Sequence, residues 1–134
     1  MKNIAILGST GSIGRSALQV VDAHPDRLRV VSLAAGDNAG LLAEQVAAYR
    51  PLTVAMATAG GIDRLRDALG PGSVPARLEA GAEGLIAVAT HPAVDIVICA
   101  SAGTAGLEAV LAAIEAGKTI ALANKEVLVM GVRW

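Results

Sequence analysis

The chain has 134 residues, of which 54% are hydrophobic, and a formal net charge of −1. This length suffices for one buried core, so we expect residues 1–134 to form one domain. The balanced charge argues against binding to nucleic acid or to an anionic membrane surface, and no apolar run is long enough to cross a bilayer. Cys99 is the only cysteine, which excludes an internal disulfide, and we predict a cytoplasmic protein.

The amino-terminal stretch joins a short apolar run to a glycine-rich turn. Ile4–Leu7 continues directly into Gly8-Ser9-Thr10-Gly11-Ser12-Ile13-Gly14. A strand that ends at glycines and continues as a helix is typical of a phosphate-binding turn: Gly8 can adopt a positive φ, Gly11 has no Cβ to block a pyrophosphate, and Gly14 allows close packing of the helix. The free N–H groups of the helix favour an anion. Because the spacing is GxxGxxG and not GxGxxG, a tight turn without a ligand is the alternative interpretation.

The remainder of the chain alternates between segments that resemble strands and helices. Apolar runs bounded by glycine or proline predict strands at Leu28–Ala35, Thr53–Ala57, Val74–Leu78, Ile96–Ala100 and Thr119–Ala123. Apolar periodicity and capping residues predict helices over Ser12–His24, from Asp37-Asn38 to Tyr49, from Gly60-Gly61 to Leu69, over Ala80–Ala89, from Gly103 to a cap at Gly117, and from Asn124 onward. The connections are too long for hairpins, so we predict an α/β fold with a doubly wound parallel sheet of the Rossmann-like type.

In such a sheet, ligands bind beyond the carboxyl ends of the strands. The residues directly after the predicted strands are therefore the candidates for a site. Besides the glycine turn, they are Gly36-Asp37-Asn38, Ala57 to Gly60, Ser101 to Gly103 and Asn124-Lys125-Glu126.

Three stretches resemble the amino-terminal domain of the 1-deoxy-D-xylulose 5-phosphate reductoisomerases. They are Lys2 to Gly14, Ala35 to Asn38, and Ala116 to Glu126, which ends in Ala-Asn-Lys-Glu. This family isomerises and reduces 1-deoxy-D-xylulose 5-phosphate to 2-C-methyl-D-erythritol 4-phosphate with NADPH and a divalent metal, in the non-mevalonate route to isoprenoids. The resemblance implies that Lys125 contacts the sugar-phosphate substrate and that NADPH is bound by Thr10, Gly11, Ser12, Ile13, Gly36, Asn38, Asn124 and Glu126.

The resemblance extends to about Met130, whereas the family continues into a catalytic domain. We therefore expect the chain to be the NADPH-binding domain of an oxidoreductase, inactive by itself, without catalytic residues or a metal site of its own. The resemblance implies that magnesium or manganese binds only with the missing domain, and that full-length relatives are homodimers. The last four residues, Gly131-Val132-Arg133-Trp134, leave the family pattern, as a truncated or frame-shifted end would.

Asp37 also departs from the family, in which a basic or neutral residue is common at this place. Its carboxylate could hydrogen-bond an NAD ribose and repel the extra phosphate of NADP, which makes it a further cofactor-binding candidate, or it could cap the next helix. Lys125 and Asn124 likewise have the simpler interpretations of a solvated lysine and a helix cap. Two alternatives remain for the whole chain: the cofactor domain of another NAD(P)-dependent dehydrogenase, and a stand-alone nucleotide-binding module.

Overall fold

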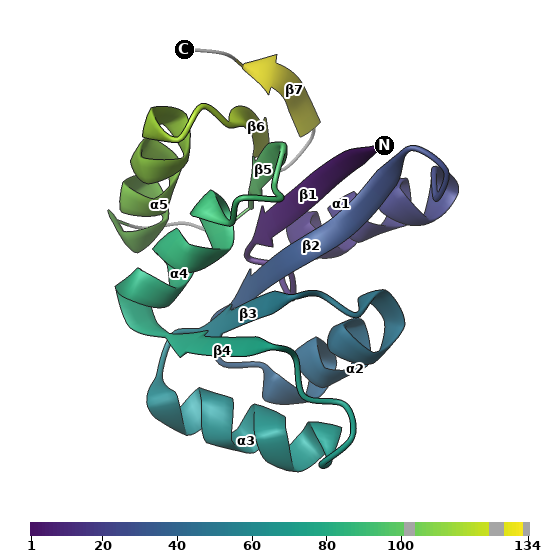
Figure 1. The fold of residues 1–134 in the computed structure, drawn as a ribbon, viewed down its shortest axis with the longest axis vertical. Coiled ribbons are helices and arrows are strands. Elements are labelled where there is room, and N and C mark those ends of the chain that lie inside the picture. Colours follow the sequence, from purple (N-terminus) through teal and green to yellow (C-terminus); the bar gives the residue numbers. More distant parts are fainter. Residues whose placement is uncertain (101–103, 124–127, 133–134) are drawn as a thin grey trace.

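The computed structural model describes residues 1–100, 104–123 and 128–132 and shows strands and helices in alternation (Figure 1). The strands are β1 (Lys2–Leu7), β2 (Leu28–Ala35), β3 (Thr53–Met56), β4 (Arg77–Ala80), β5 (Ile96–Cys99), β6 (Thr119–Ala123) and β7 (Leu128–Val132). The helices are α1 (Ser12–Ala23), α2 (Ala39–Tyr49), α3 (Ala59–Leu69), α4 (Gly81–Thr90) and α5 (Thr104–Glu115). Within the described ranges, no helix is long and apolar enough to span a membrane.

The strands form one sheet in the order β4-β3-β2-β1-β5-β6-β7. Every neighbouring pair from β4 to β6 is parallel. The chain builds outward from β1 through β2 and β3 to β4, and then returns to the other side of β1 for β5 and β6. This order confirms the predicted doubly wound sheet, and it places the end of β1 at the point where the direction of winding reverses.

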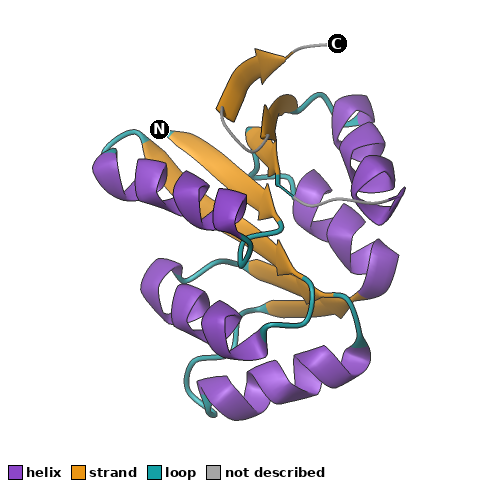
Figure 2. Ribbon diagram, turned by 180° about the vertical axis from the view of Figure 1, so that it is seen from behind, coloured by secondary structure: helices purple, strands orange, loops and turns teal. Residues whose placement is uncertain are grey.

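Helices cover both faces of the sheet. Figure 2 shows α1, α2 and α3 on one face, with α4 and α5 on the other. In β1, Ile4 and Ile6 belong to the core under α1–α3, while Ala5 and Leu7 belong to the core under α4 and α5. Because successive strand residues point to opposite faces and both faces are covered, the central strands are apolar at nearly every position.

The carboxyl end of α5 is closed by Gly117, as the sequence predicts. Gly117 has φ +80°, its N–H donates to the Ile114 carbonyl at 3.0 Å, and the Lys118 N–H donates to the Ala113 carbonyl at 3.0 Å. These two hydrogen bonds form a Schellman motif, which satisfies carbonyls that the helix leaves unpaired and directs the chain into β6.

Two predicted elements differ from the structure. The strand expected at Val74–Leu78 is β4 at Arg77–Ala80, because its bounds are set by pairing with β3, in which Thr53 lies opposite Arg77. The helix expected from Asn124 begins outside the described residues, and the prediction is wrong for Leu128–Val132, which is strand β7 and runs antiparallel to β6. The sequence Leu-Val-Met-Gly-Val suits a strand, and a short connection permits an antiparallel neighbour where a parallel one would need a crossover.

Candidate functional site

The turn between β1 and α1 contains three glycines in three different environments. Gly8 has φ +88°, which confirms the predicted sharp exit from β1. A Cβ on Gly14 would lie 2.0 Å from the Gly8 carbonyl oxygen, so Gly14 is needed for the close packing of α1 on the turn. Gly11 has φ −75°, and a Cβ there would meet only the Gly8 carbonyl oxygen, at 3.8 Å. Neither the backbone nor the packing of the chain requires glycine at position 11, which leaves room for a ligand as its explanation.

The amino terminus of α1 has no capping side chain. Its N-cap is Gly11, its first turn contains no acidic residue, and the Arg15 N–H donates to the Gly11 carbonyl at 2.9 Å. By contrast, Asn38 Oδ1 accepts from the Leu41 N–H at 3.1 Å at the start of α2, and Thr58 caps α3 in the same way. The first amides of a helix have no partner within it, so this turn presents N–H donors and a partial positive charge to an anion.

Ser9 anchors the turn to the interior. The residue is fully buried, its Oγ donates to Gln45 Oε1 at 2.7 Å, and Gln45 Nε2 donates to the Ser9 carbonyl at 2.9 Å. The Ser9 hydroxyl is therefore turned away from any ligand at the exposed Gly11. Gln45 is not among the residues predicted from the sequence. Its one signal there is its position, since it is an amide between Leu42 and Val46 on the apolar face of a helix.

The loop after β2 lies beside the glycine turn, because Leu7 pairs with Ala34 at the ends of the two parallel strands. Gly36, Asp37 and Asn38 are exposed there, and a Cβ on Gly36 would meet nothing within 4 Å. Asn38 is the cap of α2. The interpretation of Asp37 as a cap is therefore wrong, and its carboxylate accepts no hydrogen bond from the part of the chain that the structure describes.

An apolar cleft of about 260 Å³ opens between the loops that follow β1 and β2 and the helices α4 and α5. Its volume lies just below the roughly 300–1,000 Å³ that is typical of small-ligand pockets. Its walls are formed almost entirely by small side chains and backbone, from Gly8, Ala34, Ala35, Gly36, Ala55, Met56, Ala57, Gly81, Ala82, Leu85 and Gly106. The glycine turn and the loop after β2 share this cleft through Gly8 and Gly36.

The structure thus brings two groups of predicted residues to one edge of the sheet. They are Thr10, Gly11, Ser12 and Ile13 after β1, and Gly36, Asp37 and Asn38 after β2. Thr58, in a third candidate stretch, is used to cap α3, where its Oγ1 accepts from the Gly61 N–H at 3.0 Å. Asn124, Lys125, Glu126 and the stretch Ser101 to Gly103 lie outside the described residues.

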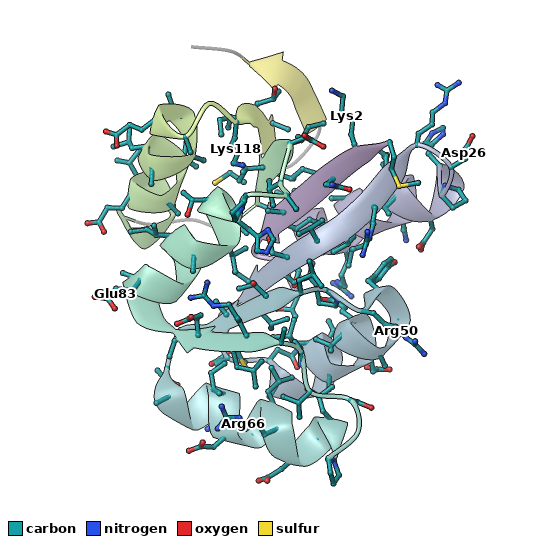
Figure 3. The ribbon with its side chains drawn as sticks, viewed as in Figure 1. Lys2, Asp26, Arg50, Arg66, Glu83 and Lys118 are labelled. Carbon is teal, nitrogen blue, oxygen red and sulfur yellow. The ribbon has the colours of Figure 1, made fainter. Side chains whose placement is uncertain are left out.

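Charged side chains do not gather into a metal site in the described ranges. No group of three or more His, Cys, Asp and Glu residues there is close enough to hold an ion. Figure 3 shows Lys2, Asp26, Arg50, Arg66 and Glu83 far apart on different elements, while Lys118, between α5 and β5, donates to the His91 carbonyl at 3.0 Å. The described residues therefore hold no cluster that fits a divalent metal.

A doubly wound parallel sheet with an uncapped glycine turn at its switch point defines a Rossmann-like domain. A comparison with known protein families identifies which kind of Rossmann-like domain it is. The chain belongs to the 1-deoxy-D-xylulose 5-phosphate reductoisomerase family, whose family model matches residues 4–132.

Named relatives agree with this assignment. The 1-deoxy-D-xylulose 5-phosphate reductoisomerase of Trichlorobacter lovleyi is 52% identical over 129 residues, which cover 96% of this chain and 33% of the relative. The chloroplastic enzyme of Oryza sativa is 48% identical over 130 residues, covering 97% of this chain and 28% of the relative. The solved structure of the Zymomonas mobilis enzyme in complex with NADPH matches with a TM-score of 0.82 and 39% identity, over 93% of this chain and 32% of that one. The chain therefore spans about a third of the length of these relatives.

Proposed function

We propose that this chain is the NADPH-binding domain of a 1-deoxy-D-xylulose 5-phosphate reductoisomerase. The observation that carries the proposal is Gly11, a glycine that the fold does not require, at the uncapped amino terminus of α1. The similar Zymomonas mobilis structure, which contains NADPH, supports the same cofactor for this chain. The reaction of the whole enzyme, the conversion of 1-deoxy-D-xylulose 5-phosphate to 2-C-methyl-D-erythritol 4-phosphate, is part of this proposal.

The two described loops would divide the cofactor between them. The backbone amides of Ser12 and Ile13 would hold the pyrophosphate together with Thr10, because an oxyanion there completes the hydrogen bonding of the first turn of α1. The Gly11 N–H already donates to the Gly8 carbonyl at 3.4 Å, so Gly11 would contribute by its missing Cβ. Gly36, Asp37 and Asn38 would contact the ribose next to the adenine. NADPH supplies a hydride when it is bound, and the task of these residues is to bind and orient it. By the family resemblance, Asn124 and Glu126 would complete the cofactor site and Lys125 would contact the substrate.

The divalent metal belongs to the remaining two-thirds of the enzyme in this proposal. One similar solved structure is a complex with NADPH, fosmidomycin and magnesium, and this chain covers 31% of it. The described residues offer no cluster of ligands for a metal, and in this proposal they act on the cofactor only. We also propose a cytoplasmic location and a homodimer of the full-length protein. The location needs its own test by cell fractionation, because the similar rice enzyme is named chloroplastic.

Calorimetric titration of the purified chain with NADPH and NADH, side by side, tests the proposal. We expect one NADPH to bind per chain, with a negative heat-capacity change, because the apolar cleft is covered on binding. If a chain shown to be folded by circular dichroism binds neither nucleotide, the proposal is refuted. Membership of the reductoisomerase family removes the reason to prefer another dehydrogenase. A stand-alone nucleotide-binding module would also bind NADPH in this titration, so an activity assay is needed to distinguish it from a domain of the enzyme.

A further inference from the structure

We propose that Gln45 is a positioning residue for the cofactor turn: with the buried Ser9 it forms a reciprocal clamp that holds the turn in its binding conformation. The inference rests on the proposed binding of NADPH at this turn. Gln45 does not reach the exposed side of the turn, since it is itself only 6% exposed and lies within α2. It would act through Ser9.

All three polar groups of Ser9 are hydrogen-bonded. Its N–H donates to the Ala34 carbonyl at 2.9 Å, its Oγ to Gln45 Oε1 at 2.7 Å, and its carbonyl accepts from Gln45 Nε2 at 2.9 Å. Partners that lie 36 positions apart in the chain are thus joined twice in the buried interior. Hydrogen bonds are strong in such surroundings, and a buried group that loses its partner is costly, so the pair defines one arrangement of Ser9.

The clamp also connects the two cofactor loops. Gln45 lies on α2, which begins directly after Gly36-Asp37-Asn38, and about two helical turns, or roughly 10 Å, separate Asn38 from Gln45. Ser9 lies in the other loop, two positions before Gly11. Holding Ser9 against α2 therefore fixes the spacing between the glycine turn and the loop after β2. A site whose donors are already in place loses less freedom when the ligand binds.

Ser32 provides a matched control for a purely structural role. Like Ser9 it is fully buried, and its Oγ donates one hydrogen bond, to the Val88 carbonyl at 2.8 Å. It lies inside β2 and connects that strand to α4, with no hydrogen bond to the turn. Ser9→Ala and Ser32→Ala therefore each delete a hydroxyl from an equally buried position, but only Ser9→Ala removes a hydrogen bond from the turn.

The experiment measures thermal unfolding, NADPH affinity and hydrogen exchange of the amides of residues 8–14 in the 134-residue chain. The variants are Ser9→Ala, Gln45→Met, the double variant and Ser32→Ala. We expect both serine variants to lower Tm similarly. NADPH binding should weaken roughly three- to tenfold in Ser9→Ala, the factor expected for losing one net hydrogen bond of the competent turn, and at least as much in Gln45→Met, which loses both hydrogen bonds of the clamp. It should not change in Ser32→Ala. The double variant should weaken binding by less than the product of the two single effects, because both act on one clamp.

Two results would overturn the inference and leave the proposed function intact. One is unchanged NADPH affinity in a folded Ser9→Ala variant, and the other is an equal loss of affinity in Ser32→Ala. If the unaltered chain binds no NADPH, the proposed function fails, and hydrogen exchange then tests the clamp. Faster exchange of residues 8–14 in Ser9→Ala than in Ser32→Ala supports the clamp. Equal exchange in the two variants refutes it. Should Gln45→Met fail to fold, Ser9→Ala decides the outcome by the same measurements.

Discussion

At the scale of single residues, the glycines of the turn between β1 and α1 are constrained in different ways. Gly8 is held to glycine by its positive φ and Gly14 by the nearby Gly8 carbonyl, whereas a side chain at Gly11 would meet no steric obstacle in the chain itself. We therefore expect substitution of Gly14 to affect mainly stability and substitution of Gly11 to affect mainly ligand binding, although both glycines belong to one motif.

Gly11→Val tests this separation. We expect the variant to lose measurable NADPH binding, because a β-branched side chain would occupy the space of the pyrophosphate. Its free energy of unfolding should fall by only about 1 kcal/mol, the usual cost of a poor N-cap residue. Calorimetry and thermal unfolding measure the two effects. Gly14→Ala is the opposite case, with an expected loss of about 1–3 kcal/mol or more from overpacking. Normal NADPH affinity in a folded Gly11→Val variant would contradict the placement of the pyrophosphate.

Asp37 is expected to weaken the preference for NADPH over NADH. Unit charges about 4 Å apart near a protein surface interact by up to roughly 4 kcal/mol before screening by salt, so its carboxylate can oppose the extra phosphate of NADPH. Asp37→Ser should raise the NADPH:NADH affinity ratio by roughly tenfold or more, measured by paired titrations at low salt. Asp26→Ser is the control, because Asp26 lies in the connection that leads into β2, at the opposite edge of the sheet (Figure 3). An unchanged ratio in Asp37→Ser would show that the carboxylate does not face the cofactor.

At the scale of elements, α1 and α2 are joined by one polar contact outside the core. The Tyr49 hydroxyl donates to Asp22 Oδ1 at 2.7 Å. Burial, with the hydrogen bond to Asp22 and the negative charge of that carboxylate as further causes, raises the pKa of Tyr49 from 10.0 to about 12. Since the folded state holds the phenol proton more tightly than the unfolded state, this stabilising contribution is complete below pH 10 and is lost as the pH rises toward 12.

Ultraviolet titration of the phenolate tests this contact directly, because Tyr49 is the only tyrosine in the sequence. We expect a midpoint near pH 12 while circular dichroism shows a folded chain. In Asp22→Asn the midpoint should fall but stay above 10, since burial is the largest cause of the raised pKa. Asp26→Asn should leave it unchanged. A midpoint near 10 in the folded, unaltered chain would show that the hydroxyl is free in solution.

At the scale of the whole molecule, the sheet places the glycine turn and the loop after β2 at one edge, but the described residues form no cluster of three or more ligands for a metal. Rearrangement of a hydroxyketone needs a cation to polarise its oxygens. We therefore predict that the 134-residue chain, saturated with NADPH and magnesium or manganese, shows no oxidation of NADPH that depends on 1-deoxy-D-xylulose 5-phosphate.

The assay compares the chain alone with the chain mixed with a separately expressed second domain from a relative, followed by NADPH absorbance. Activity of the mixture alone would support an enzyme divided at this point. Activity of the chain alone would contradict the prediction. A chain that binds NADPH but remains inactive in the mixture would favour the stand-alone nucleotide-binding module.

Much of this architecture is determined by local sequence. Apolar runs ending at glycines define β1 and β2, and the roles of Gly8, Gly14 and Gly117 follow from backbone sterics and close packing that neighbouring residues already impose. The family resemblance of the glycine turn and of Ala-Asn-Lys-Glu is likewise visible in the amino-acid sequence alone, and the match to the family model confirms it. The roles proposed for the individual site residues remain predictions.

The tertiary structure alone decided the features that depend on distant partners. The Ser9–Gln45 clamp joins two polar residues with no local reason to meet, and only burial in a shared interior makes their pairing necessary. The bounds of β4 and the antiparallel direction of β7 were set by the neighbouring strand, because edge strands have weak patterns of their own and hydrogen bonding to the sheet overrides propensity. The cap of α2 is Asn38 and not Asp37. Both residue types are good caps, so the sequence does not determine which of the two begins the helix, and the backbone geometry decides it.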